Sequence, residues 1–235
     1  MLKIGCCGFP VARRRYAATL AVAEVQQTFY QPPRVETARR WREEVPPEFE
    51  FTLKAWQLIT HEASSPTYRR LRRPLSPAER DQAGFFKDTP LVRQAWEATR
   101  EIARTLKART ILFQCPARFA PTEENRRRLR RFFHEITDED FVYAWEPRGI
   151  WDRQEVAETC RELGLLPALD PFNTSPFPGS QAYFRLHGKG GYRYAYTEED
   201  LKALGEMAAP YREGYVLFNN QHMWYDACRF AELWR

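Results

Sequence analysis

Several patterns that would assign a protein class are missing from this 235-residue sequence. No stretch approaches the ~20 consecutive apolar residues that a membrane-spanning helix needs, and residues 1–5 resemble the start of a strand rather than the apolar core of a signal peptide. The sequence therefore predicts a cytoplasmic protein with no membrane partner. The five cysteines show no C-x-x-C or Cys/His zinc spacing, which excludes a zinc finger and a disulfide framework.

Arginine, in contrast, is abundant. The 36 Lys and Arg residues exceed the 31 Asp and Glu residues, so the net charge is +5, and arginines cluster in residues 13–15, 69–73 and 126–131. Such clusters are typical of nucleic-acid binding. In residues 126–131, however, nearby glutamates and an apolar stripe at helical spacing indicate an amphipathic helix with a solvated basic face.

Short apolar runs alternate with amphipathic segments along the whole chain, which predicts eight β/α units. The expected strands are Leu2–Cys6, Ala23–Phe29, Glu50–Ala55, Thr110–Cys115, Phe141–Glu146, Leu166–Asp170, Ala182–His187 and Tyr215–Asn219. The expected helices are Val35–Glu44, Leu91–Leu106, Thr122–Ile136, Arg153–Leu163, Thr197–Ala209 and Met223–Trp234. We therefore predict an α/β fold in which residues 1–235 form a single (β/α)8 TIM-type barrel, with an open doubly wound sheet as the alternative.

Two stretches depart from this regular alternation. Residues 59–89 are rich in Pro and Arg and follow the third expected strand, where barrels commonly carry insertions over the active-site mouth, so we expect a long loop insertion there. The sixth unit lacks a long helical pattern, because residues 171–176 lead almost directly into the seventh strand.

Polar residues recur at every second position of several expected strands, which places them on one face. Glu24, Gln26 and Thr28 share a face of the second strand, and Tyr183, Arg185 and His187 share a face of the seventh. In a barrel the outward face packs against helices, so these polar faces should point inward and converge at the carboxyl ends of the strands. The residues at or near those ends are Lys54, Gln114, Glu146, Asp170, His187 and Asn219. Alternatively, the deeper charges could neutralise one another as a structural network.

The loop after the seventh strand, residues 187–193, is rich in glycine and carries Lys189 and Arg193. Barrels often bind phosphate between this loop and the one after the eighth strand, where glycine frees backbone N–H groups. The residues expected to contact substrate at this mouth are Gln114, Arg148, Arg185, Gly188, Lys189, Tyr192, Asn219 and Asn220. A plain turn is the alternative explanation for the glycines.

Several motifs together carry a family resemblance along the whole chain. They are Gly5-Cys6-Cys7-Gly8-Phe9, residues 24–30 (EVQQTFY), residues 51–55 (FTLKA), residues 59–61 (ITH), residues 112–116 (LFQCP), residues 145–148 (WEPR), residues 185–188 (RLHG) and residues 218–220 (FNN). With these motifs the sequence resembles the YecE-like family, a group of unknown function numbered seventy-two. The resemblance implies a TIM-type barrel and supplies no reaction. The chain departs from the expected family pattern at Cys7–Phe9, where Ser-Gly-Trp is expected, and at Gln26, where Asn is expected.

The candidate catalytic residues are Glu146, Asp170, His187, Lys54 and His61. The first three offer two carboxylates and an imidazole for acid/base work or for one divalent cation, Mg²⁺ or Mn²⁺; no residue is assigned as a metal ligand. Four histidines are too few for a three-zinc nuclease site. Lys54 could form a Schiff base if desolvated, but nearby carboxylates would keep it protonated as an electrostatic anchor, which we favour. His61 is either a proton-delivering lid residue or a capping side chain.

Three functions remain open from the sequence. The first is an enzyme, of hydrolase or isomerase type, that acts on a small or polymeric phosphate-bearing substrate (a phosphoester, nucleotide or sugar phosphate) by acid/base or single-metal chemistry. The second is a metal-free carbohydrate-active enzyme that uses Glu146 and Asp170 as its carboxylate pair. The third is a non-catalytic module that binds nucleic acid through its arginines.

Overall fold

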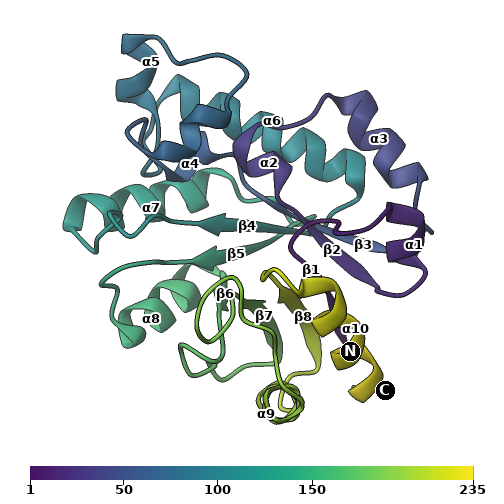
Figure 1. Cartoon of the computed structure of the whole chain (residues 1–235). Helices are drawn as coiled ribbons and strands as arrows, with labels where there is room; N and C mark the ends of the chain where they lie inside the picture. The colour runs from purple at the N-terminus through teal and green to yellow at the C-terminus, as the bar shows by residue number, and fades with distance from the viewer. Residues whose placement is uncertain (235) are drawn as a thin grey trace.

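The eight strands form a closed parallel barrel in the computed structural model, which describes residues 1–234 (Figure 1). The strands are β1 (Leu2–Cys6), β2 (Val22–Val25), β3 (Glu50–Lys54), β4 (Thr110–Gln114), β5 (Val142–Glu146), β6 (Leu166–Leu169), β7 (Gln181–Leu186) and β8 (Glu213–Phe218). Each strand pairs with the next in sequence, and β8 pairs with β1. The predicted (β/α)8 barrel is confirmed, and the closing β1–β8 pair excludes an open sheet.

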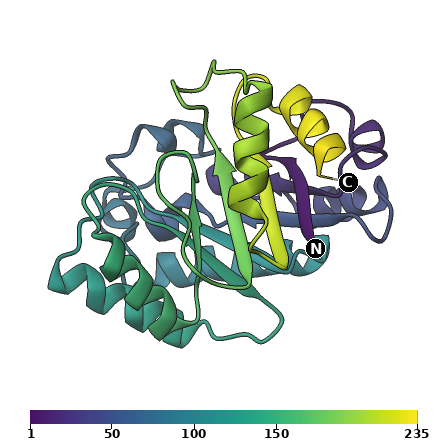
Figure 2. The same cartoon turned by 90° about the horizontal axis from the view of Figure 1, so that it is seen from below.

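Helices surround this ring of strands (Figures 1 and 2). They are α1 (Arg13–Ala17), α2 (Gln27–Tyr30), α3 (Val35–Glu43), α4 (Gln57–Thr60), the 3₁₀ helix η1 (Pro66–Arg70), α5 (Pro77–Gln82), α6 (Pro90–Leu106), α7 (Glu123–Glu135), α8 (Arg153–Leu163), α9 (Glu198–Ala208) and α10 (Met223–Leu233). The six predicted helices all form, and each end lies within one residue of its predicted position. None of the helices in residues 1–234 combines the length and apolar character that crossing a membrane requires.

Threonine caps fix the starts of two of these helices. The Thr122 hydroxyl accepts the N–H of Asn125 at 3.2 Å at the start of α7. At the start of α9, the Thr197 hydroxyl accepts the N–H of Asp200 while the Asp200 carboxylate accepts the N–H of Thr197. Each bond satisfies a backbone donor that the first turn of a helix leaves free, so the local sequence determines where the helix begins.

The second strand is shorter than predicted. It ends at Val25, and the chain turns at once into the one-turn helix α2, so the prediction that a strand continues to Phe29 is wrong. The Thr28 hydroxyl lies 2.8 Å from the Val25 carbonyl and 2.7 Å from the Lys54 carbonyl, and these contacts hold the turn against the end of β3. Thr28 therefore supports the barrel rim from α2 and does not belong to the inward face of a strand.

Two connections differ from the repeating β/α pattern. The segment between β3 and α6 contains three short elements, α4, η1 and α5, and α5 begins with a capping box between Ser76 and Glu79. Between β6 and β7 the described residues contain no helix, as the sequence predicts. The chain there runs from the carboxyl end of β6 back to the amino end of β7, where Gln181 pairs with Glu213.

The arginine cluster of α7 is neutralised within the fold. Each of its five arginines pairs with a carboxylate of α7 itself, of α8 or of the loop before α6. Arg126, for example, pairs with both Glu123 and Glu155. These partners screen the positive charge, which confirms the interpretation of this helix as a solvated basic face.

Candidate active site

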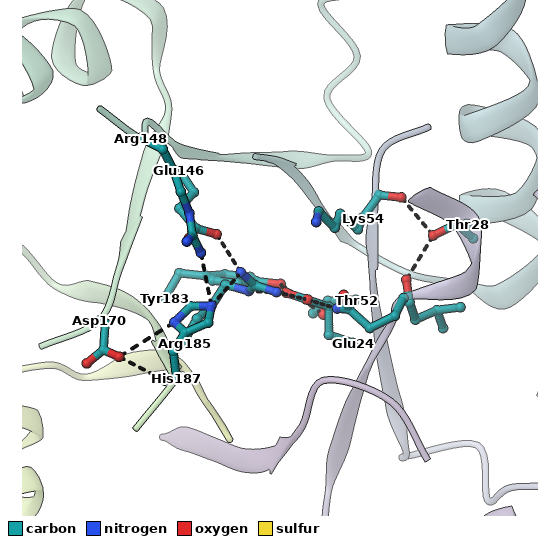
Figure 3. A network of polar contacts seen from close by, with 12 residues as sticks. Glu24, Thr28, Thr52, Lys54, Glu146, Arg148, Asp170, Tyr183, Arg185 and His187 are labelled. Atoms are coloured by element: carbon teal, nitrogen blue, oxygen red, sulfur yellow. Dashed lines mark hydrogen bonds and ion pairs between the residues drawn. The ribbon is translucent and has the colours of Figure 1, made fainter. Parts of the chain in front are cut away.

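The polar faces of the strands point into the barrel, as the alternation predicts. Figure 3 shows side chains from β2, β3, β5 and β7 directed toward one another at its centre. Below them, apolar side chains such as Leu112, Ala144 and Leu217 fill the interior. The polar layer therefore rests on a packed floor near the carboxyl ends of the strands, where barrel enzymes place their active sites.

A buried ion network centred on Arg185 crosses the barrel. The Arg185 guanidinium, whose side chain is only 1% exposed, donates to both Glu24 oxygens at 2.8 and 3.1 Å and to Glu146 Oε2 at 2.5 Å. Glu24 is fully buried and also accepts from the Tyr183 hydroxyl at 2.6 Å. Burial raises the pKa of Glu24, but the charge and hydrogen bonds of Arg185 outweigh it and lower the pKa overall. Each of the three guanidinium nitrogens of Arg185 therefore donates to one of these two carboxylates and holds it in place.

Glu146 links this network to the surface. Its Oε1 accepts two hydrogen bonds from Arg148, at 2.6 and 3.0 Å, while Oε2 accepts from Arg185. Burial opposes ionisation, but the two guanidinium charges prevail and lower the pKa of Glu146 to about 2. The carboxylate is ionised at neutral pH and serves to orient Arg148, whose side chain is 41% exposed.

His187 lies between Arg148 and Asp170 (Figure 3). Its Nε2 is 3.1 Å from a guanidinium nitrogen of Arg148 and 3.4 Å from one of Arg185. Because arginine only donates hydrogen bonds, these contacts require a lone pair on Nε2, so Nδ1 carries the proton and faces the Asp170 carboxylate 3.5 Å away. Asp170 in turn accepts the backbone N–H of His187 at 2.8 Å. These neighbours fix the orientation of the imidazole between Asp170 and the two arginines.

Lys54 ends β3 on the opposite side of the mouth. Its side chain is 6% exposed, and its Nζ lies 3.7 Å from the centroid of the Phe29 ring. The nearby carboxylates pair with arginines, and none within residues 1–234 forms an ion pair with Lys54. Burial, followed by the positive charge of Arg185, lowers the pKa of Lys54 to about 7. The carboxylates thus hold the proton on the amine less strongly than the sequence predicts, because burial and the arginine oppose them.

His61 contacts the other side of the same phenylalanine. Its ring meets Phe29 edge-on at a centroid distance of 4.9 Å, and its Nδ1 is 2.8 Å from the Thr60 hydroxyl. Burial, then the positive charge of Lys54, lowers the pKa of His61 to about 3. His61 is therefore uncharged at neutral pH and cannot deliver a proton as an imidazolium.

A cavity of about 500 Å³ opens beside Glu146, Arg148 and His187, and its lining includes neither Lys54 nor His61. It extends from Glu146, Arg148 and His187 outward between the loops that follow β5 and β6. Its remaining polar lining comes from Arg153, Asp170, Asn173 and Thr174, and its apolar lining includes Trp151 and Phe177. The volume suits a small organic molecule rather than a polymer segment.

Several predicted substrate contacts are occupied within the protein. Lys189 pairs with Asp200 and lies over Phe172. The N–H of Gly188 donates to the Tyr196 hydroxyl at 2.8 Å, and its φ of +89° explains the glycine. The glycines of this loop therefore form a turn. Four further predicted contacts do not form one binding site. Asn220 is fully buried and donates to Asp226 and to a backbone carbonyl. Tyr192 is 58% exposed, and Gln114 and Asn219 are partly buried at the ends of their strands.

The donor set does not favour a metal ion. Residues 1–234 contain no group of three or more His, Cys, Asp and Glu side chains arranged to hold one. Both Glu146 oxygens accept from arginines, and both Asp170 oxygens accept backbone N–H groups, at 3.1 Å from Phe172 and 2.8 Å from His187. The single Mg²⁺ or Mn²⁺ considered from the sequence would have to displace these partners.

The sequence model described as "Protein of unknown function DUF72" matches residues 12–235. The chain belongs to this family. No curated protein matches the sequence. A DUF72 family protein from Enterococcus faecalis V583 is 22% identical, with 99% of this chain and 97% of that chain covered and a TM-score of 0.73.

Two barrel enzymes outside the DUF72 family share the fold. The D-psicose 3-epimerase of Clostridium cellulolyticum is 10% identical over 100% of this chain and 98% of that chain, with a TM-score of 0.63. The endonuclease IV of Thermus thermophilus is 11% identical over 99% of this chain and 97% of that chain, with a TM-score of 0.57. At such identities the likeness concerns the fold alone.

Two of the departures of this DUF72 chain from the expected family pattern, Cys7 and Gln26, lie at the polar network, whereas Phe9 packs against Tyr16 and Phe49. Gln26 donates its amide to Glu24, so it contributes to the buried layer from the turn after β2. Burial raises the pKa of the Cys7 thiol, and Glu24 adds to the effect, so Cys7 stays protonated and acts as a small buried side chain. The same holds for Cys6, whose pKa is raised to about 12, chiefly by burial.

The outer wall of the cavity in this DUF72 barrel was not predicted from the sequence. Asn173 and Thr174 lie on the helix-free segment after β6, and Arg153 opens α8. The polar residues that closely follow Asp170 are a signal that could have identified them, since loops after barrel strands supply most substrate contacts.

Proposed function

We propose that the protein is an enzyme that catalyses proton transfer or bond cleavage on a small phosphate-bearing molecule bound in the cavity beside Arg148. The observation that carries the proposal is the juxtaposition of an amine that can lose its proton near neutral pH with a half-exposed guanidinium at the same barrel mouth. A reactive base and a fixed anion receptor are the two elements that acid/base chemistry on a phosphorylated substrate requires.

Arg148 is suited to bind the phosphate. Two of its nitrogens, Nε and Nη2, are engaged by Glu146, whereas Nη1 has no partner within the described residues 1–234. Glu146 therefore fixes the plane of the guanidinium and leaves one edge of it free for an anion. Arg153 lines the outer part of the same cavity and adds positive charge.

Lys54 and His187 are the groups we assign to the chemistry. A general base works best when its pKa is near the operating pH, and Lys54 meets that condition. His187 lies in the cavity wall with a defined tautomer. A phosphate that draws Arg148 toward itself would free Nε2 of His187 to accept a proton, with the Asp170 carboxylate facing the resulting imidazolium.

The structure gives less support to the alternatives. A glycosidase needs one carboxylic acid that stays protonated near neutral pH, whereas arginines lower the pKa of Glu146 to about 2. For nucleic acid, the arginines of α7 already have carboxylate partners.

The proposal is tested by measuring turnover of a panel of sugar phosphates and phosphomonoesters. We expect Lys54→Met to abolish turnover, Arg148→Met to raise KM for phosphorylated substrates at least tenfold, and the double variant Glu146→Gln/His187→Ala to be inactive. Lys202→Met, at an exposed position that pairs with Glu198 on α9, is the matched control. Turnover that survives the double variant, or that ignores Arg148→Met, overturns the proposed function.

A further inference from the structure

The amine of Lys54 has the surroundings of a nucleophile. Its nitrogen has no hydrogen-bond or ion-pair partner within residues 1–234 and stands 3.7 Å from the Phe29 ring centroid. In Figure 3 the side chain points from β3 across the mouth toward Glu146 and Arg148. A structural lysine at this depth would pair with a carboxylate, but Glu24 and Glu146 are both taken by Arg185. The amine therefore has no carboxylate partner of its own, and in its deprotonated form the lone pair is not engaged in a hydrogen bond within residues 1–234.

We propose that Lys54 forms a covalent imine with the carbonyl carbon of a phosphorylated aldehyde or ketone. This inference rests on the proposed function and narrows its substrate class from phosphate-bearing molecules to those that also carry a carbonyl group. The phosphate would bind at Arg148 and the carbonyl would lie toward Lys54. Lysine amines activated by desolvation are a recurrent source of such adducts.

Atoms and protons balance in this reaction. The Nζ lone pair attacks the carbonyl carbon and a C–N bond forms; one proton moves from nitrogen to the former carbonyl oxygen, which gives a carbinolamine. A proton taken up from solvent then lets the hydroxyl leave as water when the C–O bond breaks. The nitrogen lone pair completes the C=N bond, so amine, carbonyl and one proton yield a protonated imine and water.

The neighbouring carboxylates favour the charged product. Glu146 and Glu24 both raise the pKa of Lys54, which means that they stabilise positive charge at this nitrogen. A protonated imine carries its charge at the same place and gains the same attraction. The positive charge of Arg185 disfavours both the protonated amine and the protonated imine, and by lowering the pKa of Lys54 it increases the fraction of free amine. The site thus contains both a nucleophile and counter-charges for its adduct.

The proposal is tested by reductive trapping. The full-length protein is incubated with dihydroxyacetone phosphate, or with dihydroxyacetone as the unphosphorylated probe, and sodium borohydride converts any imine into a stable secondary amine. Intact mass and peptide mapping locate the adduct among only six lysines. We expect modification at Lys54, at least tenfold faster with the phosphorylated probe, and loss of that preference in Arg148→Met. The wild-type peptide map gives the answer even if a variant fails to fold.

Control variants separate this inference from the proposed function. Lys54→Met should lose the adduct, and Lys202→Met should retain it. The imine is overturned if the modification is spread over exposed lysines or is unchanged in Lys54→Met. If phosphorylated substrates are nevertheless turned over, and turnover depends on Arg148, the proposed function stands with Lys54 as a general base. An adduct at Lys54 that forms equally with both probes supports the nucleophile and overturns the role of Arg148 as phosphate receptor.

Discussion

Replacement of Lys54 by methionine should stabilise the protein, although it removes a residue at the centre of the site. Methionine retains the length and apolar stem of lysine without the charge. Lowering the lysine pKa from 10.5 to about 7 means that the folded state disfavours protonation at this position. At 1.36 kcal/mol per pKa unit, the cost at pH 7 is about 4 kcal/mol as an upper bound. For a chain of this length, that corresponds to a rise in Tm of roughly 8 to 16 °C.

The pH dependence of this effect follows from proton binding. Between pH 7 and 10.5 the unfolded chain keeps a proton on Lys54 that the folded protein has lost, so wild-type stability from this group rises with pH across that window. The advantage of Lys54→Met should therefore be largest at pH 7 and below and should disappear near pH 10.5. Groups that titrate in both proteins cancel in the difference.

Urea unfolding of wild type and Lys54→Met at a series of pH values from neutral to alkaline measures this difference directly. Lys202→Met is the control, and we expect it to change the free energy of unfolding by less than about 0.5 kcal/mol at every pH because the lysine is exposed. A Lys54→Met protein that is less stable than wild type at pH 7 would refute the reasoning. That result would show that Glu24 and Glu146 depend on a protonated lysine, the anchor role favoured from the sequence.

Three further predictions concern the network and the turn. Arg185→Met should lower the free energy of unfolding by about 3–5 kcal/mol in urea titrations, because it leaves two carboxylates buried without a partner; an effect below about 1 kcal/mol contradicts the network. Glu146→Gln should remove part of the acid sensitivity, because a pKa lowered from 4.5 to about 2 contributes stability above pH 4.5 that is lost as the pH falls toward 2; identical acid unfolding midpoints contradict this. Gly188→Ala should cost about 1–3 kcal/mol, since φ is +89° and a Cβ would lie 2.3 Å from the Gly191 carbonyl oxygen, whereas Gly190→Ala, with a comparatively open environment, is its control.

The sequence predicted the barrel and the inward direction of its polar residues because both follow from local periodicity. Glu146 and Arg185 alternate with outward apolar residues on their own strands. In a closed sheet the side chains of the opposite face point into the barrel. The N-cap threonines and the acidic residues after them likewise act within one helical turn. Each of these signals is complete within a short segment of chain.

The ionisation of Lys54 could not be predicted in the same way. It depends first on burial and then on which carboxylates Arg185 occupies, and that pairing joins β2, β5 and β7 across the barrel. The sequence showed that Glu24 and Glu146 share the interior with Lys54, but not that the guanidinium, with several donors in a fixed plane, would bind both of them. The anchor interpretation of Lys54 assumed that the lysine would win this competition. The end of β2 was missed for a related reason, since Thr28 closes the turn through a carbonyl on β3.

The charges along the network alternate, and this alternation adds to the effect of burial, which is the main cause of the lowered pKa of Lys54. From the barrel centre to the surface the order is Glu24, Arg185, Glu146 and Arg148, two carboxylates and two guanidinium groups joined by direct hydrogen bonds. This set is neutral without Lys54, so a proton on the lysine would add an unbalanced buried charge. An anion bound at Arg148 changes the balance, because it adds negative charge near the mouth and raises the pKa of Lys54. A phosphate-bearing ligand should therefore promote proton uptake by the amine, or formation of a cationic adduct, at the moment it binds. Isothermal calorimetry can measure this proton uptake when inorganic phosphate is titrated into the protein just above neutral pH, in buffers of different ionisation enthalpy. The wild type should take up to one proton and Lys54→Met none. Equal uptake by the two proteins would show that a group other than Lys54 binds the proton.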